Sequence, residues 1–197
     1  MVGKANNGGG LGIRVEIDAD LTAGRQSDLT ARAKAGDKGA FDAILRPLFQ
    51  PAYHLAYVML RDREAAEDAV QEAALKTWRK LPSMRPETDL RPWFLGFVAN
   101  ECRNSRRSRW RAVLRLGERD DIASPDPTWV SDPDLLRALV RLPSRDRLLV
   151  LLHFYLDMRV EEIAVITGSR ASATRSRLYR AVKRMRPHLD DGEAAHD

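Results

Sequence analysis

The 197-residue chain contains one cysteine, Cys102, and therefore cannot form a disulfide bond within itself. Disulfides persist mainly in oxidising compartments, so this scarcity favours a protein of the reducing cytoplasm. Cys102 lies in an arginine-rich helical stretch, where we expect a small buried filler rather than a reactive thiol. No apolar run approaches membrane-spanning length, and the N-terminus lacks the apolar core of a signal peptide. These absences predict a cytoplasmic protein without membrane insertion.

The chain also lacks the residue patterns of common enzyme sites. Its four histidines, His54, His153, His188 and His196, are scattered, and it has no glycine-rich loop of the kind that cradles phosphates. The acidic side chains of residues 64–72 have neither a histidine nor a second acidic cluster at metal-ligand spacing. We therefore predict no catalytic residue, no metal and no cofactor, which argues against an enzyme such as a nuclease.

Positive charge, in contrast, is abundant and is divided into two blocks. The net charge is +5 and the sequence pI is about 9.6. Residues 91–115 contain seven arginines and one acid, residues 116–135 six acids and one arginine, and residues 157–188 eight basic residues and three acids. Two basic blocks separated by an acidic strip predict two nucleic-acid contacts joined by a tether that avoids DNA.

The second basic block has the pattern of a helix-turn-helix. Val160, Ile163 and Ile166 recur at helical spacing, Gly168 suits the left-handed end of that helix, and Ser169 can cap the next one. A solvated basic hairpin is the alternative, but the turn, the cap and the one-sided arginines together favour DNA binding. The residues expected to face the major groove are Arg170, Ser172, Ala173, Arg175, Ser176, Arg177 and Arg180.

Two helices are predicted in the first third of the chain. Ser27 can cap a short helix to residue 35, and Asp37 can cap a longer one to about residue 60. Pro47 and Pro51 each remove a helical hydrogen bond, so we expect a kink or break there. Residues 1–26 are expected to be flexible, although the alternating apolar residues between 13 and 17 would also suit a strand or a binding peptide.

Two more helices precede the acidic strip. Asp62 can open the first, whose acidic face on residues 64–72 suits either solvent or a protein partner. Asp89 can cap the second, over residues 90–110, in which Trp93 and Phe97 are expected to pack inward. Its outer face combines amides, which can reach base edges, with guanidinium groups, which neutralise phosphates. This face consists of Asn100, Arg103, Asn104, Arg106, Arg107 and Arg109.

The C-terminal half is expected to begin after a proline-containing acidic linker. Ser144 can cap a strongly apolar helix over residues 148–156, which would pack on the helix-turn-helix and on a partner. The sequence thus predicts an all-α protein of two small helical domains joined by an extended acidic linker. The predicted boundaries are a flexible extension 1–26, a helical domain 27–110, a linker 111–133, a helix-turn-helix domain 134–188 and a flexible tail 189–197.

This ordered set of motifs resembles the extracytoplasmic-function (ECF) sigma factors of bacterial RNA polymerase over residues 27–188. Residues 63–81, REAAEDAVQEAALKTWRKL, resemble the helix that docks on the polymerase clamp. Residues 90–109, LRPWFLGFVANECRNSRRSR, resemble the helix that melts and reads the −10 element, and residues 139–186 resemble the −35-reading domain. The sequence departs from the family at Thr174, usually an apolar β-branched residue, and at Arg159, where a capping serine is common. Both departures predict less firmly held helices.

The resemblance implies a sigma factor that binds core RNA polymerase through its clamp and flap, recognises promoter DNA and carries out no bond chemistry. It further implies that the loop 83–89 holds a flipped base, that the linker enters the polymerase cleft, and that an anti-sigma factor is a further partner. The implied polymerase-binding residues are Asp68, Gln71, Glu72, Trp78 and Arg79. The implied −10 contacts are Arg85, Asp89, Asn100, Arg103, Asn104, Arg106 and Arg107, and the implied −35 contacts are the major-groove residues of the helix-turn-helix.

Two alternatives remain besides an enzyme. A free-standing helix-turn-helix regulator would explain residues 160–186, but not a second basic helix beside an acidic docking face. An RNA-binding adaptor would use the arginine-rich helix over residues 100–115 and would prefer structured RNA to promoter duplex.

Overall fold

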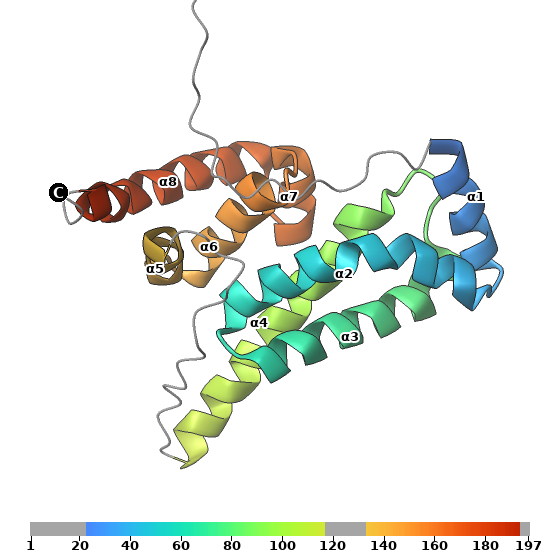
Figure 1. Ribbon diagram of the computed structural model, residues 1–197, viewed down its shortest axis with the longest axis horizontal. Coiled ribbons are helices and arrows are strands. Elements are labelled where there is room, and N and C mark those ends of the chain that lie inside the picture. The colour runs from blue at the N-terminus through green and yellow to red at the C-terminus, as the bar shows by residue number, and fades with distance from the viewer. Residues whose placement is uncertain (1–22, 117–132, 194–197) are drawn as a thin grey trace, which may run out of the picture.

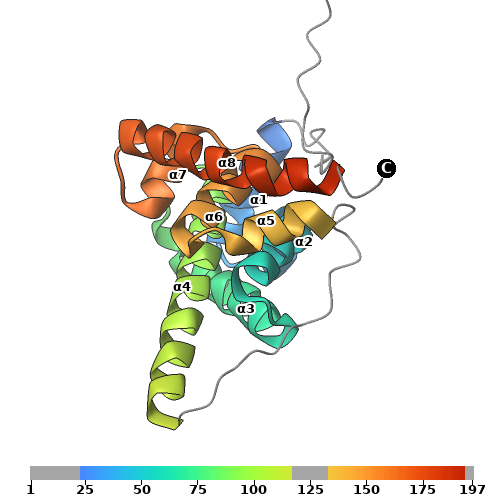
Figure 2. The ribbon, with the colours of Figure 1, turned by 90° about the vertical axis from the view of Figure 1, so that its left-hand side faces the viewer.

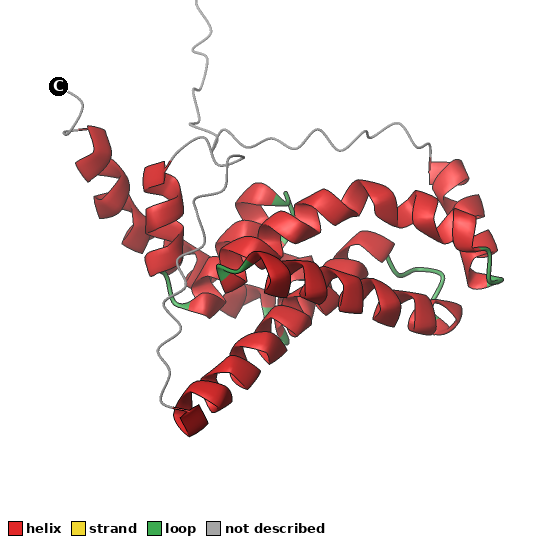
Figure 3. Ribbon diagram, turned by 60° about the horizontal axis from the view of Figure 1, so that its bottom comes forward, coloured by secondary structure: helices red, strands yellow, loops and turns green. Residues whose placement is uncertain are grey.

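The computed structural model describes residues 23–116 and 133–193, which contain helices and turns but no strand (Figure 3). The predicted all-α class is confirmed. The proposed strand near residue 15 and most of the predicted linker lie outside the described residues. Within these ranges, no helix is both long and apolar enough to cross a membrane.

The N-terminal bundle packs three long helices side by side, with a short helix across one end (Figure 1). Its core contains the fully buried side chains of Leu45, Leu55, Phe94 and Leu95. Cys102 is also fully buried in it, and burial raises the pKa of the thiol to about 12, which agrees with the predicted role as a filler. The elements are α1 (Ala23–Lys34), α2 (Lys38–Leu60), α3 (Arg63–Lys80), a 3-10 turn (Leu81–Ser83) and α4 (Leu90–Leu116).

The C-terminal bundle forms a second group of helices around Leu136, Leu152 and Ile163. Figures 1 and 2 show these helices together above one end of the N-terminal bundle, while the C-terminal half of α4 projects away from both. The elements are α5 (Pro133–Arg141), α6 (Ser144–Val150), a π-helical turn (Leu151–Tyr155), α7 (Val160–Thr167) and α8 (Ala171–Glu193).

Three predicted helix ends are confirmed. Asp37 Oδ1 accepts a hydrogen bond from Ala40 N at 3.0 Å, and Asp62 Oδ1 accepts one from Ala65 N at 2.9 Å. Each carboxylate satisfies a backbone amide that has no partner within its helix. Gly168 has φ +64° at the end of α7, in the left-handed region that favours glycine.

Several predictions of local structure were wrong. Helix α1 begins at Ala23, so Ser27 lies inside it rather than capping it. Helix α2 continues through Pro47 and Pro51 without a break. A proline inside a helix costs about 3 kcal/mol, and burial of one whole side of α2 offsets that cost. Pro143, not Ser144, occupies the cap position of α6, and no side chain caps that helix.

Two helices are longer than predicted. Helix α4 extends six residues beyond the predicted end at residue 110, because residues 111–116 contain no glycine or proline that would end it. Helix α8 continues past Pro187 to Glu193, so the first part of the predicted flexible tail is helical.

The two bundles contact each other, an arrangement that the sequence did not predict. Helix α2 packs against α5 and α6, and α4 packs against α7. His54 Nδ1 on α2 lies 2.5 Å from Tyr155 Oη, and Arg103 on α4 donates to Ile166 O at 3.2 Å. Arg91 donates to Leu156 O in the same interface. Two of these three contacts are accepted by backbone carbonyls, which carry no signal in the sequence.

Candidate polymerase and nucleic-acid interfaces

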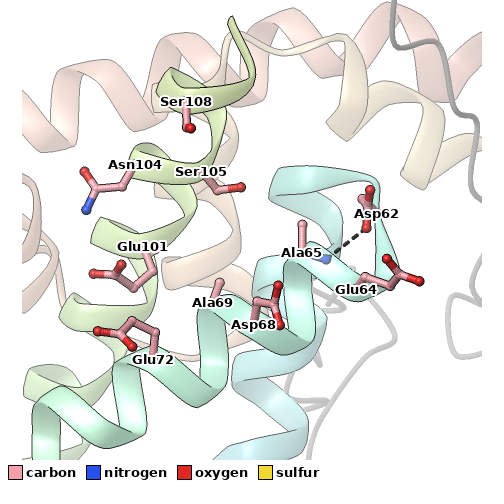
Figure 4. A pocket seen from close by; sticks show the side chains of 10 residues that line it. All are labelled: Asp62, Glu64, Ala65, Asp68, Ala69, Glu72, Glu101, Asn104, Ser105 and Ser108. Carbon is pink, nitrogen blue, oxygen red and sulfur yellow. Dashed lines mark hydrogen bonds between the residues drawn. The ribbon is translucent and has the colours of Figure 1, made fainter. Parts of the chain in front are cut away.

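An acidic groove lies between α3 and the middle of α4, on the surface of the N-terminal bundle (Figure 4). Two predicted polymerase-binding residues, Asp68 and Glu72, line it. Lys76 bridges the two helices at its edge, with Nζ 3.3 Å from Glu72 and 2.8 Å from Glu101. The hydrogen bond to Glu101 is the main reason why the pKa of Lys76 is raised. The complete lining is Asp62, Glu64, Ala65, Asp68, Ala69, Glu72, Glu101, Asn104, Ser105 and Ser108.

Three of the carboxylates in the groove were not among the predicted polymerase-binding residues. Asp62, Glu64 and Glu101 were not predicted as site residues, although Glu101 stands out as the one acid in the first arginine block. Among residues 23–116 and 133–193, no three His, Cys, Asp or Glu side chains are grouped to hold a metal ion. Five carboxylates, those of Asp62, Glu64, Asp68, Glu72 and Glu101, make the groove acidic.

The other predicted polymerase-binding residues lie on different parts of α3. Gln71 and Arg79 are exposed. Trp78 is half-buried, and its ring meets the edge of Phe41 on α2 with ring centroids 4.9 Å apart. Trp78 thus contributes to packing between α2 and α3 and presents only part of its ring to a partner.

The predicted −10 face is exposed except at one position. Arg85 and Asp89 are exposed before α4, and Asp89 Oδ1 accepts a hydrogen bond from Arg91 N at 2.9 Å, which supports its predicted role as a cap. Arg103 is half-buried beside α7, and desolvation lowers its pKa. The side chain of Arg109 lies outside the described residues. The remaining candidates, Asn100, Asn104, Arg106 and Arg107, are exposed on α4.

Helix α8, the predicted recognition helix, has one buried side and one exposed side, as the sequence predicted. Leu178, Ala181 and Met185 are buried, and Thr174 is only 2% exposed. All seven predicted −35 contacts are exposed: Arg170 lies directly before α8, and the helix itself carries Ser172, Ala173, Arg175, Ser176, Arg177 and Arg180.

Hydroxyl groups stabilise the turn before α8. The prediction that Ser169 caps α8 was wrong, because the helix begins two residues later, at Ala171. The Ser169 hydroxyl instead lies 2.7 Å from Thr167 Oγ1 and 2.8 Å from Thr174 Oγ1. The buried Thr174 hydroxyl therefore has a hydrogen-bond partner, which reduces the cost of replacing the apolar residue usual at this position.

Ion pairs link the recognition helix to its support. Asp146 at the start of α6 is buried and lies 2.6 Å from Arg184 and 3.4 Å from Arg177. Arg175 lies 3.3 Å from Glu161 on α7, but both side chains are largely exposed. Exposed pairs contribute little to stability, so this contact holds Arg175 only weakly.

Both bundles match known families. Residues 45–112 match Sigma-70 region 2, and residues 133–185 match Sigma-70, region 4. The chain is 30% identical over 141 residues to "RNA polymerase sigma factor SigV" of Bacillus subtilis, an alignment that spans 71% of this chain and 85% of that protein. The chain belongs to the extracytoplasmic-function sigma factors.

Two further comparisons agree with this assignment. The chain is 28% identical over 160 residues to "ECF RNA polymerase sigma factor SigM" of Mycobacterium tuberculosis, over 81% of this chain and 82% of that protein. Its fold is similar to that of the sigma factor RpoE in a complex with the anti-sigma factor NepR from Bartonella quintana, with a TM-score of 0.69 and 25% identity over 76% of this chain and 96% of that one. This ECF sigma factor is therefore an alternative specificity factor for bacterial core RNA polymerase at promoter DNA, as the sequence motifs predicted.

Proposed function

We propose that this sigma factor divides its contacts among three surfaces: the acidic groove for core polymerase, α4 with the preceding loop for the −10 element, and α8 for the −35 element. The observation that carries this assignment is the two-sided α8, which has a buried inner side and six exposed predicted DNA contacts, with a seventh, Arg170, exposed directly before the helix. Exposed arginine, serine and alanine side chains on one helix suit the major groove, where guanidinium groups recognise guanine and apolar groups contact the thymine methyl.

For the −10 element, we propose that exposed amides and guanidinium groups on α4 hold the edge of the melted DNA. Asn100 and Asn104 lie one turn apart and can reach base edges, while Arg106 and Arg107 lie near enough to neutralise phosphates. Arg103 can join them only after its contact with Ile166 has opened. The factor itself performs no bond chemistry in this proposal, because the polymerase joins the nucleotides. It therefore works in the cytoplasm, where the polymerase is.

The proposed function is tested by a pull-down with bacterial core RNA polymerase, followed by transcription from pooled genomic DNA. We expect stoichiometric binding and new start sites that share −35 and −10 elements. Sequence-specific duplex binding by the protein alone, without binding to core polymerase, would instead support a free-standing regulator.

The role of the acidic groove can be tested separately in the same pull-down. Asp68→Lys should weaken core binding by at least about tenfold, because it replaces an attractive charge in the proposed interface with a repulsive one. Glu67→Lys is the matched control: Glu67 is exposed on α3 but does not line the groove. Equal effects of the two substitutions would indicate a general charge effect and would remove the groove from the interface.

Arg175 tests the assignment of the −35 surface. We expect Arg175→Ala to weaken discrimination at one −35 position by about 1–3 kcal/mol, the typical contribution of a bidentate contact to a base. Transcription from promoters carrying every base at each −35 position measures this loss. Lys183→Ala, an exposed charge further along α8, should leave the discrimination unchanged. A uniform loss at all positions would make Arg175 a phosphate contact.

A further inference from the structure

A hollow of about 440 Å³ lies where the C-terminal bundle meets α4. Its size is within the range of small-molecule sites, about 300–1,000 Å³. One lining residue comes from α4 and the others from the C-terminal bundle, so the hollow exists only while the two bundles are in contact. The lining is Arg103, Arg145, Leu148, Leu149, Thr167, Gly168, Ser169, Ala173, Thr174, Ser176, Arg177 and Arg180.

Four guanidinium groups line this hollow, and its lining contains no carboxylate. Arg177 lies 3.4 Å from Asp146, which is outside the lining and is shared with another arginine. Within residues 23–116 and 133–193, no carboxylate pairs with Arg103, Arg145 or Arg180. The hollow therefore carries a positive charge that the protein itself hardly neutralises.

The contact between the bundles brings like charges together. Desolvation lowers the pKa of Arg103 on α4, and the charge of Arg145 on α6 lowers it further. The two guanidinium groups thus repel each other across the hollow. An anion between them would attract both, and a ligand that binds only the contacting arrangement stabilises that arrangement.

The guanidinium groups are also the donors that remain for a ligand. The hydroxyls of Thr167 and Ser176 already donate to the backbone carbonyls of Ile163 and Ser172, at 2.8 Å and 3.0 Å. Arg145, in contrast, is exposed at the rim of the contact. A guanidinium group presents a planar fork of N–H donors that matches the oxygens of a phosphate. Several such forks around one hollow suit a chain of phosphates better than a single one.

We propose that the hollow binds a small molecule that carries two or more linked phosphate groups, held by Arg103 of one bundle and Arg145 of the other. The bound molecule keeps the two bundles in contact. It also excludes promoter DNA, because four lining residues are predicted −35 contacts: Ala173, Ser176, Arg177 and Arg180. Only this exclusion of DNA rests on the proposed function.

The test is calorimetric titration of the full-length chain with inorganic pyrophosphate in a magnesium-free buffer. We expect one site per chain. Arg145→Met and Arg103→Met should each weaken binding by about tenfold or more, since each removes charge-assisted hydrogen bonds. Pyrophosphate should also slow amide hydrogen exchange where α4 meets α7, because it holds that contact closed.

The controls separate a phosphate site from general attraction to a basic protein. Arg186→Met removes an exposed charge of α8 that does not line the hollow, and should change the affinity by less than about twofold. Citrate, an anion of several charges without phosphate, should bind at least about tenfold more weakly. ADP distinguishes the source of the phosphates: tighter binding than pyrophosphate identifies a nucleotide, and weaker binding identifies the inorganic anion.

Three results would overturn the proposal: an equal loss for Arg186→Met and Arg145→Met, no loss for Arg103→Met, or equal affinities for citrate and pyrophosphate. The exclusion of DNA is measured with a labelled duplex that carries the mapped −35 element. Pyrophosphate should displace this duplex from the unchanged protein, and Arg145→Met should require about tenfold more. Failure to bind core polymerase would overturn the proposed function and leave the phosphate site standing.

Discussion

Replacing Arg147 with methionine should lower the free energy of unfolding by about 3 kcal/mol or more, because it leaves several buried carbonyl groups without their donor. Arg147 is 7% exposed. It donates to Leu139 O at 3.0 Å, Leu142 O at 3.2 Å and Val58 O at 3.0 Å, and also to Val140 O. One side chain thus closes the end of α5 and joins the C-terminal bundle to α2.

The Arg147 guanidinium makes these hydrogen bonds in its charged form. Burial lowers the pKa of Arg147 to about 10, so the guanidinium is still charged at neutral pH. Methionine fills a similar volume without donors, so the substitution isolates the hydrogen bonds from the packing. Urea denaturation measures the loss, and small-angle scattering reports whether the bundles separate.

Arg145→Met is the matched control, two residues away and exposed. We expect it to change stability by less than about 0.5 kcal/mol, as is usual for surface substitutions. If Arg147→Met were as mild, the four carbonyl contacts would not determine the stability of the interface.

Acidification should destabilise the folded protein through His54. This side chain is 7% exposed, and desolvation lowers its pKa from 6.5 to about 4. The folded state therefore favours neutral His54, while the unfolded chain takes up a proton as the pH falls below about 6.5. Stability is complete above that value and declines as the pH falls toward 4, by about 3 kcal/mol in all.

The contact between the two bundles buries His54, and this burial is the reason why its pKa is lowered. His54 Nδ1 meets Tyr155 Oη at 2.5 Å, and burial raises the pKa of Tyr155 to about 12, so the tyrosine keeps its proton throughout this range. Protonating His54 would place a charge in a site that offers little solvation. The effect should therefore favour separation of the bundles as well as unfolding.

Comparison with His54→Gln isolates this contribution, because carboxylates also begin to titrate near pH 4. Urea denaturation between pH 7.5 and 4.5 should show a shallower pH dependence for the variant than for the unchanged protein. His153→Gln, the control, alters a histidine that lies 2.9 Å from Met158 O within the C-terminal bundle. An identical pH profile for His54→Gln and the unchanged protein would exclude His54 as the source.

The sequence alone determined the all-α class, most of the helices and the two sides of the recognition helix. Asp37, Asp62 and Gly168 marked helix ends correctly because each acts on backbone groups within four residues. Apolar spacing placed Leu178 and Met185 on the buried side of α8 for the same local reason. The predicted DNA and polymerase contacts follow from the family motifs, and their individual roles stay predictions.

Only the tertiary structure decided how the helices meet. Tertiary packing keeps α2 helical at its two prolines, although proline disfavours the interior of a helix. It also brought together partners far apart in sequence: Lys34 with Met84, Arg103 with Ile166, and Arg147 with Val58, separated by 50, 63 and 89 residues. In each of these contacts the acceptor is a backbone carbonyl. Every residue carries that group, so no pattern of side chains can indicate which carbonyl an arginine or lysine will reach.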